Sequence, residues 1–273
     1  NADIQTMVMQ FRRDTSLDTY TVDYRRLDKP DAILDDALAL LKRVPFQNAV
    51  YLSSKICRSQ FSSHSFSFVN DCVSPILTKI DNFGSFKLND KEIGQGVVIP
   101  QDCLNKDCQK ILGEPHFAGE GIFVLSTPEI NDLNLTKMEM SLIRPYFTST
   151  QVQRYVTFSQ NTHWLIYTDS SYNNSRAMDH YPHLKNHLDR FQDIITSDNK
   201  PYGLHRARDE RFFNGEKIIA LRKCVDRPLF SYSDFDCYVS ATFYVIKTSR
   251  LNCKYLLGIL NSNLIAFWLR FRG

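Results

Sequence analysis

Hydrophobic positions in the first quarter of the chain repeat with two different periods. Residues 4–11 and 18–27 are rich in strand-forming side chains, and a polar, turn-forming stretch separates them. The next hydrophobic positions recur at helical spacing and share one helical face: Ile33, Leu34, Ala37, Leu38 and Leu41. Residues 45–68 are polar and rich in serine, which predicts a linker or an irregular connection.

The rest of the chain mixes short strands with helices. Helices are predicted at 70–83, at 135–144, where Pro145 ends the helix, and at 181–195, where Pro182 stands in the first turn. One or two further helices are expected over 252–270. Strands are predicted at 92–100, 119–126, 152–158, 163–168, 217–223, 228–233 and 236–248. We expect the runs at 152–158 and 163–168 to pair as a hairpin. Because strands and helices do not alternate regularly, the pattern predicts an α+β fold with mixed, mainly antiparallel sheets, packed helices and a helical C-terminus.

Charge is concentrated in one part of the sequence. The 273 residues carry a net charge of only +3, and 43% of them are hydrophobic, which is enough for a sizeable core. Residues 200–227 alone contain eight Lys or Arg and four Asp or Glu, a charge of +4, so the remainder of the chain is close to neutral. A local basic stretch on a near-neutral chain suits a polyanionic partner. A solvated, charge-mixed hairpin explains the composition equally well.

Cysteine usage and hydropathy restrict the class of protein. The seven cysteines include no Cys-x-x-Cys pair, so neither a zinc ribbon nor a disulfide framework is indicated, and reduced thiols in the cytoplasm are expected. The N-terminus has no signal-peptide pattern. Polar residues 261–263 interrupt the most apolar late run, which predicts a buried helix and no membrane span. Because no initiator Met is present, we expect an excised part of a larger protein.

The basic stretch supplies the candidate binding residues. The first-choice candidates lie close together in it: His205, Arg206, Arg208 and Arg211. They cannot all be buried, because burying unpaired charge is too costly. Asp209 or Glu210 is expected to pair with at least one of these arginines, which would then have a structural role. Phe212 and Phe213 are expected to anchor the loop in the core. Second-rank candidates for phosphate contacts are Lys217, Arg222, Lys223, Arg144 and Arg154.

Two further motifs suggest chemistry and are weighed against simpler interpretations. His183 and His187 stand at i, i+4 near His180, which would suit a metal site, but no acidic ligand is placed beside them, so a surface helix with polar histidines is favoured. The tetrapeptide "NKPY" at 199–202 is one residue away from the Asn-Pro-Pro-Tyr loop of DNA amino-methyltransferases. Lys200 replaces the first proline, and no nucleotide-binding glycine loop precedes it. We therefore assign no catalytic or cofactor-binding residue to this chain.

Longer segments resemble a known family. "YGLHRARDERFFNGEKIIALRKCVDRPLFSYSDFDCYVSATFYVIK" and "CKYLLGILNSNLIAFWL" resemble the TaqI-like C-terminal specificity domain of adenine-specific DNA methyltransferases. "GQGVVIP", "GEGIFVLS", "LIRPYFTSTQVQRY" and "YPHLKNHLDRF" occur upstream in the order that this family shows. The resemblance covers about residues 70–273, while residues 1–30 look more loosely like the end of a methyltransferase domain.

The resemblance implies that DNA recognition and methyl transfer belong to different domains. Residues 71–273 would form a target recognition domain that binds double-stranded DNA, after a remnant of the catalytic domain at 1–30 and a helix and linker at 31–70. S-adenosylmethionine would bind to the upstream methyltransferase domain of the intact enzyme, which in some relatives is fused to an endonuclease. This chain itself would hold no cofactor and be inactive alone. Two alternatives stay open: a protein-interaction scaffold with a basic surface, and a metallonuclease that uses His180, His183 and His187.

Overall fold

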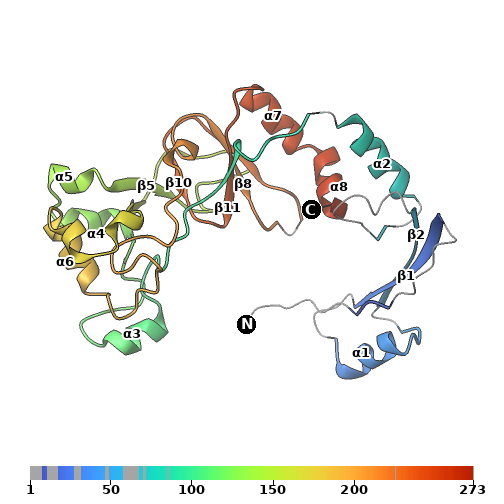
Figure 1. The fold of residues 1–273 in the computed structure, drawn as a ribbon, viewed down its shortest axis with the longest axis horizontal. Coiled ribbons are helices and arrows are strands. Elements are labelled where there is room, and N and C mark those ends of the chain that lie inside the picture. Colours follow the sequence, from blue (N-terminus) through green and yellow to red (C-terminus); the bar gives the residue numbers. More distant parts are fainter. Residues whose placement is uncertain are drawn as a thin grey trace. The chain divides into compact units, whose positions relative to one another are not determined.

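The chain folds into two compact units, residues 1–85 with 270–273, and residues 86–269. The structure, a computed structural model, describes residues 8–10, 18–27, 32–46, 49–57, 68–69, 72–84, 86–224 and 226–272. In this part of the chain no helix is long and apolar enough to cross a membrane. The expected α+β class is confirmed, since helices accompany mixed and mostly antiparallel sheets (Figure 1).

The first unit contains a long antiparallel hairpin. Strand β1 (Thr19–Leu27) pairs along its whole length with β2 (Ala49–Cys57). Helix α1 (Leu34–Leu41) lies between them in sequence, as its hydrophobic spacing predicted, and α2 (Ser74–Phe83) follows. The predicted linker is therefore wrong over 49–57, because a polar, serine-containing run can still supply backbone hydrogen bonds to a partner strand. Of the strand expected at 4–11, residues 8–10 are not extended into a strand, and the others lie outside the described residues.

The second unit contains two sheets. The strand order of the five-stranded sheet is β3-β11-β8-β9-β6, and that of the four-stranded sheet is β10-β5-β7-β4. Only β6 with β9 and β10 with β5 are parallel pairs among the named strands of this unit. The first sheet contains β3 (Ile93–Gln95), β11 (Phe243–Ile246), β8 (Lys217–Leu221), β9 (Phe230–Ser233) and β6 (Tyr155–Val156). The second contains β10 (Tyr238–Val239), β5 (Ile143–Phe147), β7 (His163–Ile166) and β4 (Val124–Ser126).

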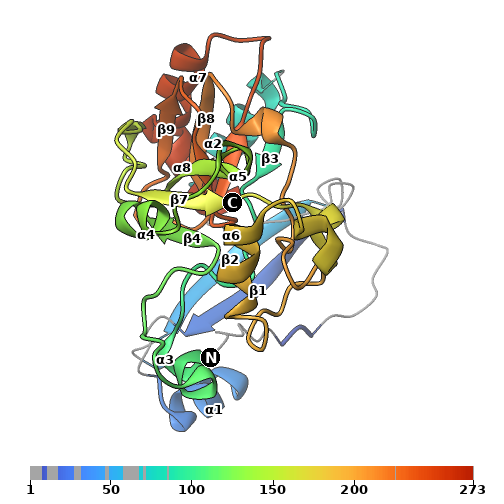
Figure 2. The same ribbon diagram turned by 90° about the vertical axis from the view of Figure 1, so that its left-hand side faces the viewer.

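Helices and short 3-10 turns cover these sheets. Figure 2 shows α4 beside β4 and β7, and the two strands contact that helix. The helices of this unit are α3 (Lys106–Leu112), α4 (Thr127–Asp132), α5 (Lys137–Met140), α6 (Pro182–Asp189) and α7 (Cys253–Leu260), and α8 (Asn263–Arg272) ends the chain. The 3-10 turns are η2 (Ser170–Tyr172), η3 (Ser175–Met178) and η4 (Glu210–Phe212).

One helix prediction and one strand-pairing prediction are corrected. The helix expected up to Pro145 ends at Met140, and Pro145 lies inside β5. Strand β10 pairs only with Tyr146 and Phe147, so Pro145 needs no ladder partner on that side. The expected hairpin is absent: β6 pairs with β9, and β7 pairs with β4 and β5. Short apolar runs predict a strand without specifying its partner.

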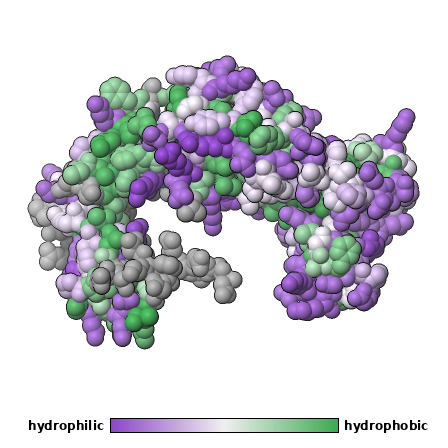
Figure 3. Space-filling view, turned by 180° about the vertical axis from the view of Figure 1, so that it is seen from behind, coloured by the Kyte–Doolittle hydropathy of each residue, from purple (hydrophilic) through white to green (hydrophobic). Residues whose placement is uncertain are grey.

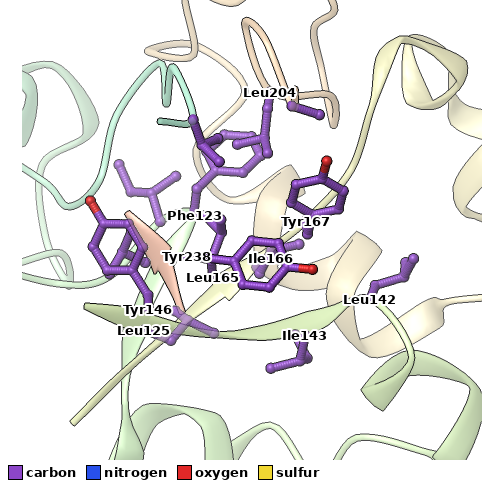
Figure 4. Packing of buried hydrophobic residues seen from close by; sticks show 14 of the residues in the cluster. Phe123, Leu125, Leu142, Ile143, Tyr146, Leu165, Ile166, Tyr167, Leu204 and Tyr238 are labelled. Carbon is purple, nitrogen blue, oxygen red and sulfur yellow. The ribbon is translucent and has the colours of Figure 1, made fainter. Parts of the chain in front are cut away.

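The cores explain how the sheets are held. The larger core joins both sheets to α6, and Figure 4 shows Phe123, Leu165 and Tyr238 at its centre. A smaller core lies on the other face of the five-stranded sheet, where Ile218 and Ile246 pack against α7. On that same face Tyr244 stays 40% exposed. The face of the five-stranded sheet that carries the smaller core is therefore partly exposed to solvent, at Tyr244.

Candidate nucleic-acid interface

The loop at 199–209 is fixed by its own polar side chains. The Asn199 amide donates to the carbonyl oxygens of Leu204, at 2.8 Å, and His205, at 3.3 Å. Tyr202 is buried, and its hydroxyl donates to an Asp189 carboxylate oxygen at 2.6 Å. The "NKPY" tetrapeptide therefore shapes this loop. The imidazole Nδ1 of His205 lies 3.3 Å from the Asp198 backbone nitrogen, which keeps this side chain beside the loop.

Two phenylalanines tie the following turn to the core. Phe212 and Phe213 are both buried, as expected. The Phe213 ring stacks on Tyr238, with centroids 4.8 Å apart. Because these rings are anchored below the surface, the cations that precede them are carried on a fixed support.

Carboxylates neutralise two of the candidate arginines. Arg144 donates from Nε to Glu210 at 2.8 Å, and its guanidinium lies over the rings of Tyr167 and Tyr238. Arg211 pairs with Asp209, with 2.8 Å between Nε and Oδ2. This is the structural pairing expected within the basic stretch. Arg144 likewise braces β5 against η4.

Two second-rank candidates already donate hydrogen bonds to backbone carbonyl oxygens of this chain. Lys217 is fully buried and donates to the carbonyl oxygens of Gly215, at 2.8 Å, and Phe235. Burial lowers the pKa of Lys217 to about 8. The structure thus does not present this ammonium to a phosphate, because the alternation along β8 points it into the larger core. Arg154 donates to the carbonyl and side-chain oxygens of Asn261.

Three arginines remain together on one surface. We call Arg206, Arg208 and Arg222, with Gln95 and Tyr244, the arginine patch. Arg208 Nη2 donates to Gln95 Oε1 at 2.6 Å, and Gln95 Nε2 donates to the carbonyl oxygen of Ala241 at 3.3 Å. Arg222 Nη1 reaches that same carbonyl at 3.0 Å, and its guanidinium carbon lies 5.2 Å from the Tyr244 ring centroid.

No carboxylate in the described ranges forms an ion pair with Arg206, Arg208 or Arg222. Burial lowers the pKa of Arg208, and the positive charge of Arg206 lowers it further. The Nε–H of Arg208 is buried without a hydrogen-bond partner among these residues. Close, uncompensated guanidinium groups repel one another, so an anion placed against them would relieve the repulsion and bind. Lys223, also exposed, follows Arg222 directly.

The glycines of "GQG" set the position of Gln95. A Cβ at Gly94 would lie 2.7 Å from the Phe212 ring, and one at Gly96 would collide with the Ser240 carbonyl oxygen. Only glycine lets this segment approach so closely on both sides. Sequence reasoning missed Gln95 and Tyr244, although the two glycines were a visible sign of close packing.

The three histidines do not form a metal site. His183 Nδ1 bonds to the buried Glu139 carboxylate at 2.9 Å, and His187 Nε2 bonds to the Ile122 carbonyl oxygen at 2.9 Å. The expected surface helix is wrong for His187, which is buried because it lies on the same face as Leu184 and Leu188. In the described part of the chain no group of three or more His, Cys, Asp or Glu could hold a metal ion.

Large hydrophobic side chains are also exposed on the surface of the protein. On the face that Figure 3 shows, hydrophobic residues gather in one area at the upper left and in smaller patches among hydrophilic residues elsewhere. Scattered exposed hydrophobic residues are normal on protein surfaces. The arginine patch brings together three cations without carboxylate partners among the described residues, so we take it as the candidate binding site.

An α+β domain with such a patch has a surface suited to a polyanion. Residues 144–271, which include all three patch arginines, match the family model of the TaqI-like C-terminal specificity domain. The family resemblance is therefore confirmed over these residues. Comparison with curated proteins gives no match.

Among solved structures, the type IIL restriction-modification enzyme MmeI in complex with DNA is similar at 12% identity, with a TM-score of 0.43. The similarity covers 65% of this chain and 21% of that one. The chain thus spans about a fifth of the length of that enzyme.

Proposed function

We propose that this chain is the DNA sequence-recognition part of an adenine-specific, type IIG-like DNA methyltransferase of a restriction-modification system. It binds duplex DNA through the arginine patch. The observation that carries the proposal is that Arg206, Arg208 and Arg222 lie together without carboxylate partners, inside the residues that match the specificity-domain family.

The patch suits duplex DNA in two ways. Arginine forks bind phosphate oxygens bidentately and also read base edges. Each phosphate contact releases counterions, so binding would weaken steeply as salt rises. Arg211 and Arg144, which are already neutralised, would contribute less than the first-choice and second-rank assignments from sequence suggested.

The proposal assigns the chemistry to another domain. An upstream methyltransferase domain of the intact protein would bind S-adenosylmethionine and transfer its methyl group to the exocyclic amine of adenine. The residues of this chain would hold the duplex and select the sequence. The cytoplasm, where free thiols such as Cys103 and Cys224 stay reduced, is the compartment that this role implies.

The test is the salt dependence of duplex binding, measured by fluorescence anisotropy with a labelled random-sequence duplex. The association constant K falls as salt rises, so the slope of log K against log salt is negative. We expect the magnitude of this slope to decrease by about 0.9 in Arg206→Ala and in Arg222→Ala. Arg176→Ala removes the same charge from an exposed site in η3 and serves as the matched control. It should leave the slope unchanged.

Absence of salt-dependent duplex binding by the unmodified chain would refute the proposal. Equal effects of all three substitutions would show that net charge, rather than the patch, drives association. Binding of an acidic protein partner with the same dependence on Arg206 and Arg222, but no DNA binding, would favour the scaffold alternative.

A further inference from the structure

We infer that Arg208 reads a guanine in the major groove, while Arg206 and Arg222 hold the neighbouring phosphates. This inference rests on the proposed function and assigns different tasks to the three members of the patch. It follows from how differently their guanidinium groups are held.

Arg208 is held at the tip of its side chain. Its Nη2 donates to Gln95 Oε1, and Gln95 is fixed in turn by the Ala241 carbonyl oxygen. The two flanking glycines permit the close packing that sets the backbone of Gln95. A guanidinium oriented before binding loses little freedom on contact, and its direction is reproducible. Such rigidity is needed to distinguish one base edge from another, since a misdirected fork meets the wrong donor or acceptor.

The backbone of Arg208 is also unusual. Its φ is +74°, in the left-handed region that favours glycine, and its carbonyl oxygen accepts a hydrogen bond from the Tyr167 hydroxyl at 2.6 Å. The preceding Ala207 is buried. A strained residue persists where its surroundings hold it, and such residues cluster at ligand-binding positions. In this conformation the side chain reaches Gln95 of β3.

The free edge of Arg208 matches one base. Gln95 takes one hydrogen of Nη2, and among the described residues Nη1 has no hydrogen-bond partner. The remaining Nη hydrogens form a two-donor fork. In the major groove, guanine presents two adjacent acceptors, O6 and N7, to such a fork. A phosphate could also accept it, but a phosphate does not require a fixed direction.

Arg206 and Arg222 lack this support. Arg206 is exposed, and within the described ranges its side chain forms no hydrogen bond. Arg222 is exposed and bonds only to the Ala241 carbonyl oxygen while lying over Tyr244. Side chains with this freedom can follow the phosphate backbone whatever the sequence, so their contacts position the duplex and do not select a base.

The experiment selects bound duplexes from a library with a randomised centre and sequences them, using the full chain and three variants. Arg208→Lys keeps the charge but cannot form the fork. Arg208→Gly removes the side chain and suits the positive φ. Arg211→Lys makes the same chemical change at an arginine paired with Asp209 and is the control. Thermal melting of each variant checks that it folds.

We expect the unmodified chain and Arg211→Lys to enrich one G·C pair at a fixed position. Replacing that pair with A·T should weaken their binding by about 5- to 150-fold. Both Arg208 variants should lose this preference, and Arg208→Lys should keep its affinity for random duplexes within about twofold. A duplex with 7-deazaguanine at that position, which lacks N7, should weaken binding to the unmodified chain and leave Arg208→Lys unaffected.

Retention of the full guanine preference by Arg208→Lys would overturn the inference and leave the proposed function standing. An equal loss on all duplexes would make Arg208 a phosphate contact, and duplex binding without any base preference would also overturn the inference. If the unmodified chain binds no duplex at any salt concentration, both the inference and the proposed function fail.

Discussion

Replacing Glu139 with glutamine tests whether a buried carboxylate joins α5 to α6. The side chain of Glu139 is completely buried. It accepts hydrogen bonds from the backbone N–H of Thr136, at 2.8 Å, and of His183, at 2.7 Å. The ring nitrogen Nδ1 of His183 and the backbone N–H of Leu184 also form hydrogen bonds to this carboxylate. The glutamine amide has one acceptor oxygen, so it leaves some of these donors without a partner.

The magnitude follows from the pKa of this carboxyl group. Burial acts to raise the pKa of Glu139, but the hydrogen bonds from Thr136 and His183 outweigh it and lower the pKa from 4.5 to about 2. One pKa unit corresponds to 1.36 kcal/mol, so the ionised form stabilises the fold by about 3 kcal/mol. Because the folded-state pKa is depressed, this stability is present above pH 4.5 and is lost as the pH falls towards 2.

The assay is urea unfolding of the unmodified chain, Glu139→Gln and Glu114→Gln between pH 7 and pH 3. Glu114 is exposed, so its substitution is a matched control and should change stability by less than about 0.5 kcal/mol. We expect Glu139→Gln to lose about 3 kcal/mol at pH 7 and progressively less below pH 4.5. A loss that is constant across this pH range would refute the reasoning, because it would mean that ionisation of Glu139 does not stabilise the fold.

Two other substitutions test the packing around the histidines and the patch. His187→Ala should destabilise the fold by about 2–3 kcal/mol in a thermal melt, since it removes a buried ring and leaves the Ile122 carbonyl oxygen unpaired, whereas His180→Ala at an exposed position should have little effect. Equal melting temperatures for the two variants would contradict this. Gly96→Ala should lower the free energy of unfolding by at least about 2 kcal/mol, because the added Cβ would collide with the Ser240 carbonyl oxygen. Urea unfolding measures this change. A variant as stable as the unmodified chain would disprove the close approach of Gly96 to Ser240.

Local patterns predicted the helices better than the sheets. The hydrophobic spacing at 33–41 and 181–195 corresponds to α1 and α6, because a helix forms from contacts three and four residues apart. Strand partners are set at long range. Nothing in the residues of β6 indicates that β9, more than seventy positions later, is its neighbour. The failed hairpin prediction has this cause, and so does the failure to recognise β2.

The candidate site could be located from sequence but not resolved into roles. The charge excess at 200–227 indicated the stretch that contains the three patch arginines, yet it could not show which cations are neutralised. Arg144 finds its carboxylate at Glu210, 66 positions away, and Arg208 finds Gln95 at a separation of 113. Lys217 was expected at the surface, but the alternation of β8 buries it. These outcomes depend on the tertiary fold.

The contrast between paired and unpaired arginines bears on what the patch is for. Pairing with a carboxylate was available within the same short stretch, since Asp209 neutralises Arg211 and Glu210 neutralises Arg144. Arg208 and Arg222 instead bond to neutral oxygens of Gln95 and Ala241, which orient a guanidinium without cancelling its charge. Clustered like charges and a buried, unpartnered Nε–H lower the stability of the free protein. An arrangement that orients its cations and keeps their charge is disadvantageous for folding alone and becomes favourable when an anion binds. The same feature that weakens the free domain would therefore supply part of the driving force for the DNA binding that we propose.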